Sequence, residues 1–313
     1  MRKNVAKNLI AALALSTIAS PAVLLADTAA TTQSETTLES LRPGVSPSDK
    51  DSIDNEITNA RMRADAGSQS RNSMSLSLGY KGGSVKSPFD AQRPNLSGDP
   101  STETSAAMSG SISARHRFNP RTSATLGAGI SALEPFHGVE EFSIDNPALG
   151  LNRTYRVGPF QTMTSVSATL GTSESWKNAN QTHSFAISQT MMSQIGNSGF
   201  TAGASVQVVT NHFSDSATGP GDARTDWRIG FYPQLEYTIN DRLSARTVFG
   251  YFNYYSFRGT DRTDFKNVVV YQSVGIGISI TRDIYLYPNV QFIPDDLSVD
   301  NTNVAMSATI NLF

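Results

Sequence analysis

The four histidines are the side chains here that most readily act as general bases or metal ligands. They stand far apart in the chain, at His116, His137, His183 and His212. A hydrolase needs a histidine, a nucleophile or paired aspartates, and an orienting group brought to one place. The sequence has no glycine-rich phosphate loop, no paired-histidine motif and no nucleophile elbow. His137 lies near Glu140 and Glu141, a spacing that could bind a metal weakly, but a solvated loop is the favoured interpretation. We therefore predict no catalytic residue, metal site or cofactor.

Six charged residues form the second group, because they occupy the polar phase of alternating segments. They are Arg115, Arg117, Arg156, Arg228, Glu236 and Arg246. Charges are costly in lipid, so this phase is predicted to line a water-filled interior. Five arginines against one glutamate predict an interior that is positive on balance and weakly favours anions. In the alternative interpretation, loop carboxylates such as Glu140 and Glu141 pair with the arginines and stiffen the wall.

The aromatic residues form the third group, and most of them fall in the opposite, outward phase. A predicted girdle at the membrane–water boundary consists of Trp227, Phe231, Tyr237, Phe249, Tyr251 and Tyr255. A carbohydrate-stacking track would need inward rings. Four rings have that phase but are scattered: Tyr232, Phe252, Tyr254 and Tyr271.

These groups need elements of period two to position them. From Val268 to Ile280, from Ile284 to Phe292 and again from Val304 to Leu312, every second residue is apolar or nearly so. Strict alternation indicates β-strands. The opposite faces carry mostly Ser, Gly, Thr, Asn and Tyr, which suits a polar lumen behind a lipid-facing wall. The fold class predicted is all-β, a single antiparallel transmembrane β-barrel.

Bulk properties agree with this class. The net charge of −2 gives no electrostatic reason to expect a nucleic-acid partner. Only 17% of the residues are charged and the mean hydropathy is −0.27, as expected where alternation dilutes the apolar residues. Basic residues, an apolar run and small residues near Ala26 have the three-part form of a signal peptide over residues 1–26, and no stretch is long enough for a helical span.

Residues 27–70 are expected to form a short periplasmic leader, because they lack alternation. Residues 48–67 could form a helix, capped by Ser48 and ended by Gly67, with Arg61 and Arg63 in its late turns. Two interpretations stay open for the leader. It is a solvated tether, or it folds into or across the mouth of the barrel.

The barrel is predicted to occupy residues 71–313 and to have twelve strands. Eleven strands are obvious, but single-chain bacterial barrels have an even number. The placement of short turns requires one more strand between Ala132 and Phe160, and residues 149–157 are the candidate. Pro233 lies within a strand, so a bulge or a missing ladder bond is expected there. The short turn at residues 240–242 predicts that Glu236 lies opposite Arg246 as a lumen ion pair.

The sequence with these features resembles the bacterial outer-membrane β-barrel class and is porin-like. The resemblance covers residues 72–313 and includes the terminal aromatic residue, Phe313. In that class the apolar positions near the end are in phase with the terminal aromatic residue, whereas here they are one residue out of phase. The resemblance implies a place in the bacterial outer membrane, contact with its lipid, and insertion by the barrel-assembly machinery.

The function predicted is that of a passive pore for small hydrophilic solutes, partly occluded by the N-terminal segment if that segment folds inward. The alternative is a structural or surface-interaction barrel, adhesin-like, that only anchors long outer loops. The two functions differ in whether the lumen is open. Twelve strands enclose only a modest bore, which inward arginine and tyrosine side chains or residues 27–70 could fill.

Overall fold

The fold is seen in a computed structural model that describes residues 56–96, 104–138, 141–216, 222, 224–259, 261, 264–267 and 270–312. The predicted signal peptide and most of the predicted leader lie outside the described residues. No helix in the described part of the chain has both the length and the apolar character needed to cross a membrane.

The strands form one closed antiparallel barrel. Their bounds are β1 Asn72–Ser84, β2 Ala107–Asn119, β3 Thr122–Leu133, β4 Glu141–Val157, β5 Phe160–Leu170, β6 Gln181–Gln194, β7 Phe200–Phe213, β8 Thr225–Thr238, β9 Leu243–Gly250, β10 Phe252–Phe257, β11 Phe265–Asn267, β12 Tyr271–Ser279, β13 Ile284–Phe292 and β14 Asn303–Leu312. β9 and β10 both pair with β8, so together they count as one strand of the barrel. On their other side β9 pairs with β12 and β10 pairs with β11, so β11 and β12 together count as the next strand. β1 pairs with β14 and closes the ring. The predicted count of twelve strands is confirmed.

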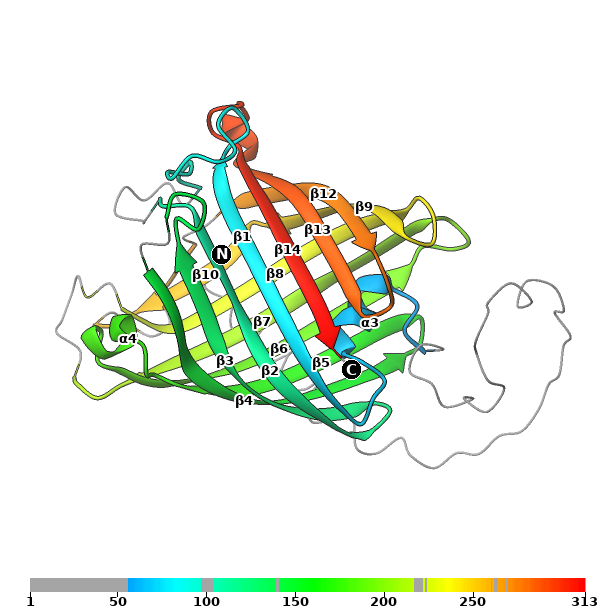
Figure 1. The fold of residues 1–313 in the computed structure, drawn as a ribbon, viewed down its shortest axis with the longest axis horizontal. Helices are drawn as coiled ribbons and strands as arrows, with labels where there is room; N and C mark the ends of the chain where they lie inside the picture. Colours follow the sequence, from blue (N-terminus) through cyan, green and yellow to red (C-terminus); the bar gives the residue numbers. More distant parts are fainter. Residues whose placement is uncertain are drawn as a thin grey trace, which may run out of the picture. The chain divides into compact units, whose positions relative to one another are not determined.

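Short turns and long loops alternate along the chain. Tight turns join β2 to β3, β4 to β5, β6 to β7, β8 to β9 and β12 to β13, at the end of the barrel where β14 finishes (Figure 1). The longer connections, which include α4 (Glu174–Asn178) and the 3-10 turn η2 (Pro294–Asp296), lie at the other end. This is the asymmetry of bacterial barrels, in which the short turns are periplasmic and the long loops extracellular.

The additional strand that the count required is β4, and it is longer than predicted. It includes residues 149–157 but begins eight residues earlier, at Glu141. A bulge explains why its first half was missed. Gly127 pairs with Ala148 while Gly129 pairs with Asp145, so two residues of β4 oppose one of β3, and Asn146 has φ +51°. The extra residue shifts the phase of alternation within the strand.

A second bulge lies beside Pro233, where the sequence predicted one. Gln234 pairs with Val248, yet Phe231 pairs with Phe252, so two residues of β8 oppose three residues between β9 and β10. Proline cannot donate to the ladder, and a local irregularity removes the need for that bond. The chain that follows the turn at residues 240–242 is therefore divided into β9 and β10.

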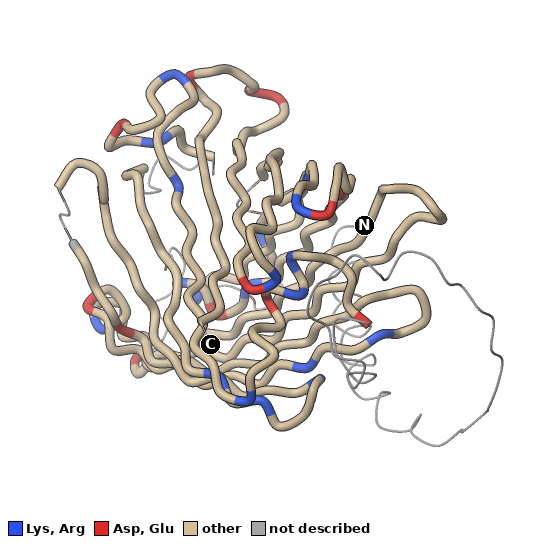
Figure 2. The backbone as a smooth tube through the Cα atoms, turned by 45° about the vertical axis from the view of Figure 1, so that its right-hand side comes forward, with Lys and Arg blue, Asp and Glu red and all other residues tan. Residues whose placement is uncertain are grey.

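The two faces of the wall differ sharply in chemistry. Large apolar side chains are exposed on the outside, among them Leu126, Leu149, Leu151, Val166 and Phe185. Residues of the opposite phase are polar and buried, among them Ser75, Thr154, Gln161, Gln234 and Ser273. Figure 2 shows long stretches of strand without charge, and charged residues at strand ends and near the helical segment. Apolar side chains facing outward and polar ones facing inward are what a lipid-embedded barrel requires.

In the described residues, the predicted helix over residues 48–67 is interrupted at residues 57–59, and α3 (Ala60–Ala66) covers its last turns. Its N-cap is Asn59, whose side chain accepts a bond from the Met62 amide, and the predicted cap Ser48 lies outside the described residues. The predicted end at Gly67 is confirmed, with φ +84°. The helix starts late because Asn59 is extended and its amide, like that of Thr58, is bonded to a barrel side chain.

Candidate functional site

The described part of the leader, residues 56–70, enters the lumen at the short-turn end of the barrel. Its hydrogen bonds reach inward-facing side chains on β2, β5, β8 and β14. These strands stand on different sides of a closed ring, so a segment that contacts all of them lies inside it (Figure 1). We call residues 56–68 the lumen segment.

The first side of the lumen segment is held through a single glutamine of β5. Gln161 Oε1 accepts bonds from the backbone amides of Thr58 and Asn59, each at 2.9 Å, and its Nε2 donates to Thr58 Oγ1 at 2.8 Å. Gln161 is buried, and so is Ile57, which packs with Met62 and Met192. A buried amide that makes all three bonds fixes both the position and the direction of the entering chain.

The second side is held by arginines that cap the end of α3. Arg115 donates to the carbonyl oxygens of Ala66 and Asp65, and Arg117 donates to those of Ala66, Gly67 and Ser68. The last carbonyls of a helix lack partners within it and carry partial negative charge, so guanidinium groups satisfy them well. The positive φ of Gly67 favours glycine, and a Cβ there would also force the Arg115 guanidinium, 2.5 Å away, to shift.

Glu236 and Arg246 lie opposite each other, as the turn geometry predicted. Both are buried, at 4% and 7% exposure. No direct ion pair joins them among the residues that the structure describes. Glu236 accepts a bond from Asn59 Nδ2 at 3.1 Å, and Arg246 donates to Gln234 Oε1 at 2.7 Å. The register was predicted correctly, but the ion pair is replaced because the lumen segment offers Glu236 a closer partner.

The other two charged residues of the predicted lining lie farther along the wall. Arg156 pairs with Gln161 across the sheet and is exposed near the short-turn end. Arg228 is half-buried on β8, in Coulombic range of Lys81 and Tyr232. The carboxylates proposed as alternative partners, Glu140 and Glu141, lie outside the described side chains.

The bulge beside Pro233 corrects part of the aromatic assignment. Tyr255 pairs with Arg228, and directly opposed residues share a face, so Tyr255 does not belong to the outward girdle predicted for it. Phe252 pairs with Phe231 and contacts its ring, so its predicted inward phase is wrong, and Tyr254 follows it. One extra residue between β9 and β10 reverses the faces of the side chains of β10.

The remaining rings of the predicted girdle can be placed by their contacts. Tyr237 is 45% exposed and its ring lies 4.8 Å from that of Phe200. Phe249 and Tyr251 are in contact at 5.7 Å. Trp227 pairs with Thr210 across the sheet. Their depth in a membrane stays a prediction.

The histidines are less isolated than the sequence suggested. His183 and His212 pair across β6 and β7, and their rings stack 4.5 Å apart, with Phe185 at the edge. His137 contacts the carbonyl of Phe89. Within the described residues no group of three or more potential ligands could hold a metal ion. The sequence could not reveal the stack, because the two residues are neighbours only in the sheet.

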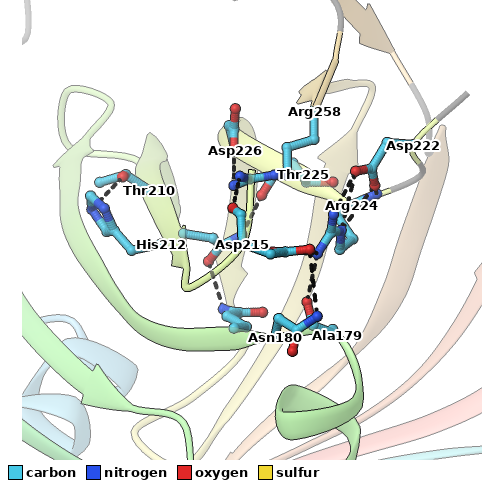
Figure 3. Close-up of polar contacts among 12 residues, drawn as sticks. Ala179, Asn180, Thr210, His212, Asp215, Asp222, Arg224, Thr225, Asp226 and Arg258 are labelled. Carbon is cyan, nitrogen blue, oxygen red and sulfur yellow. Dashed lines mark hydrogen bonds and ion pairs between the residues drawn. The ribbon is translucent and has the colours of Figure 1, made fainter. Parts of the chain in front are cut away.

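At the long-loop end, a charged cluster ties three connections together (Figure 3). Arg224 forms ion pairs with Asp215 at 2.8 Å and with Asp222 at 2.7 Å, and Arg258 forms one with Asp226 at 3.2 Å. Both guanidinium groups lie over the Phe213 ring, at 5.2 and 4.5 Å.

This cluster changes the ionisation of its members. The hydrogen bonds from Arg224 lower the pKa of Asp215 below its usual value, and those to Asp222 and Asp215 raise the pKa of Arg224. Arg224 also donates to the Ala179 carbonyl at 3.0 Å, which ties the loop after β7 to the one after β5. These contacts join the loops to one another at the rim of the barrel.

Several lumen residues were missed by the sequence reasoning. Gln161 and Gln234 occupy the inward phase, but an uncharged amide gave no signal there. Tyr285 and Tyr287 are buried beside Ala64, and they alternate with outward Ile284 and Leu286, so the alternation could have revealed them. Lys81 lies in the inward phase of β1, two residues after Gly79.

The closed ring, its apolar exterior and its polar interior define a porin-like β-barrel. Comparison of the sequence with protein-family models and with curated proteins gives no match. Among solved structures, the chain is similar to the NanC porin, with 10% identity over 76% of this chain and 98% of that chain, and a TM-score of 0.42. It is similar to an outer membrane channel from Pseudomonas putida F1, with 12% identity, coverage of 79% and 98%, and a TM-score of 0.48. The KdgM porin, solved in complex with disordered oligogalacturonate, gives 7% identity, coverage of 76% and 98%, and a TM-score of 0.41.

Proposed function

We propose that the protein is a passive pore of the bacterial outer membrane for small hydrophilic solutes. The observation that carries the proposal is the contrast between the two faces of the closed wall. Large apolar side chains are exposed outside, whereas the inside is lined by amides, hydroxyls and arginines. A lining of this kind suits the water-filled interior of a channel.

The lumen segment narrows the pore at its short-turn end. It is bonded to several strands and its apolar residues Ile57 and Met62 are buried, so it occupies part of the bore that twelve strands enclose. A pore of this kind conducts modestly. Export through the inner membrane with a cleaved signal peptide, and insertion by the barrel-assembly machinery, belong to the same proposal.

The charges of the lining favour anions weakly. Of the six charged residues predicted to line the lumen, five are arginines, and one of these, Arg115, is bound to the neutral carbonyl groups of Ala66 and Asp65. A neutral partner orients a guanidinium group but leaves its charge in place, so the field of the lumen stays positive.

Conductance in planar bilayers tests the proposal. The purified mature protein should give single-channel events of modest size, and reversal potentials in a salt gradient should show a weak anion preference. A folded, inserted protein without any conductance would refute the pore and favour the surface-interaction barrel. A clear cation preference would show that carboxylates of the loops, rather than arginines of the wall, set the field.

A further inference from the structure

A cavity of about 370 Å³ lies inside the barrel, beside the lumen segment. Its lining comes from α3 and from seven strands, and it contains three cations, Arg61, Lys81 and Arg246, with no carboxylate among the described lining residues. Tyrosine rings, amides, serine hydroxyls and a few small or apolar residues make up the rest of the lining. The volume suits a small solute and falls within the usual range of ligand sites.

The most informative feature of this cavity is that two guanidinium groups share one neutral oxygen. Arg61 Nη1 donates to Gln234 Oε1 at 3.1 Å, and Arg246 Nη2 donates to the same oxygen at 2.7 Å. Gln234 and Arg246 are 5% and 7% exposed. Two like charges repel each other strongly where little water screens them. An amide oxygen can hold both groups in place but cannot neutralise them.

The available carboxylates compensate this charge only in part. Asp65 lies 3.4 Å from Arg61 Nε on the same helix face, and Glu236 is bonded to Asn59. Neither lines the cavity. The positive charge of Arg246 is therefore directed toward the cavity without a carboxylate in direct contact.

Other lining groups have unused capacity for a ligand. The Oδ1 of Asn289 is buried and accepts no hydrogen bond within the described structure. Among the described residues Lys81 forms no hydrogen bond or ion pair, and its side chain is exposed inside the barrel and lies near Arg228. The Tyr287 ring lies 4.8 Å from the Arg246 guanidinium and offers an apolar face.

We propose that this cavity binds a small hydroxylated organic anion, with its carboxylate between Arg61 and Arg246. Guanidinium groups bind carboxylates through short, charge-assisted hydrogen bonds. Lys81 adds a third positive charge. Asn289 Oδ1 accepts a hydrogen bond from a hydroxyl of the solute, and the tyrosine rings contact the carbon skeleton of the solute. The proposal deepens the proposed function and rests on it, since the ligand is a solute of the pore. It also gives the lumen segment a part in binding, because Arg61 belongs to that segment.

Calorimetric titration of the refolded full-length mature protein in detergent tests this site, with glucuronate as the anionic probe and glucose as its neutral counterpart. Wild type should bind glucuronate and leave glucose unbound. Arg246→Gln should weaken glucuronate binding by about tenfold or more, the loss expected for a charged hydrogen bond. Arg153→Gln is the matched control, since Arg153 lies outside the lumen over the Tyr155 ring and its loss removes the same charge.

A second variant guards against misfolding of Arg246→Gln. Lys81→Gln changes an exposed side chain, and it should weaken glucuronate binding while the heat-modifiable mobility of the folded barrel is kept. Folded wild type that binds no glucuronate, or that binds glucose equally well, would overturn the site. Equal binding by wild type and by both lumen variants would overturn it as well.

The titration is separable from the test of the pore. A protein that binds glucuronate but conducts no ions would retain the site and lose the proposed function. A protein that conducts but binds no glucuronate would retain the pore and lose the site.

Discussion

Replacing Gln161 by alanine should release the lumen segment while leaving the barrel intact. The side chain makes three hydrogen bonds to Thr58 and Asn59, at 2.8 to 2.9 Å, and all three connect the segment to the wall. Gln161→Ala removes them together. The ladder between β4 and β5 uses the backbone and should persist.

The size of the effect follows from the number of bonds. A hydrogen bond within a protein contributes about 1 kcal/mol net, so three contribute about 3 kcal/mol to docking of the segment. Since about 1.4 kcal/mol corresponds to a tenfold change, the undocked population should rise by about 100-fold. The capping arginines on β2 remain, so the segment should open more often without leaving its site.

Hydrogen exchange measures this directly. The amides of Met62 and Arg63 are bonded within the segment, so their exchange reports on its opening. Asn152→Ala is the matched control, because the side chain of Asn152 accepts a bond from Ser165 and, among the described residues, forms no hydrogen bond with the segment. Faster exchange is expected in Gln161→Ala alone. Equal exchange in both variants would refute the view that Gln161 holds the segment.

Three further predictions concern the register, the bore and the rim. In the folded barrel, Glu236→Cys and Arg246→Cys together should form a disulfide on oxidation, whereas Leu235→Cys with Arg246→Cys should not, and the opposite yields would disprove the register of this hairpin. Deletion of the leader, so that the mature chain begins at Arg71, should raise single-channel conductance, and an unchanged conductance would reduce the segment to a tether. Because the pKa of Asp215 is lowered in the folded protein, its ion pairs should stabilise the long loops above the usual carboxylate pKa and lose that effect as the pH falls through the lowered value. Proteolysis of these loops should therefore be constant near neutral pH and increase only in acid, and an increase already near pH 6 would contradict this assignment.

Alternation along the chain was sufficient to predict the wall of this barrel. Period two depends only on residues two apart, so it can be read within each strand. It revealed eleven strands. The even strand number of such barrels and the short turns then supplied the twelfth strand and placed Glu236 opposite Arg246, and the structure contains both. Alternation failed where a strand carries an extra residue. The bulge at Asn146 hid the first half of β4, and the bulge beside Pro233 reversed the faces of Phe252, Tyr254 and Tyr255.

The interior was decided by tertiary structure alone. The bonds of Asn59 join it to Gln161 and Glu236, which lie 102 and 177 residues away in the chain. No periodicity relates such positions, and the local signals favoured a helix that continues through residues 57–59, where the structure has none. The sharing of Gln234 by Arg61 and Arg246 arises in the same way, since it needs the segment already docked. The sequence by itself determined a wall and its two faces. What fills the lumen depends on contacts that exist only once the ring has closed.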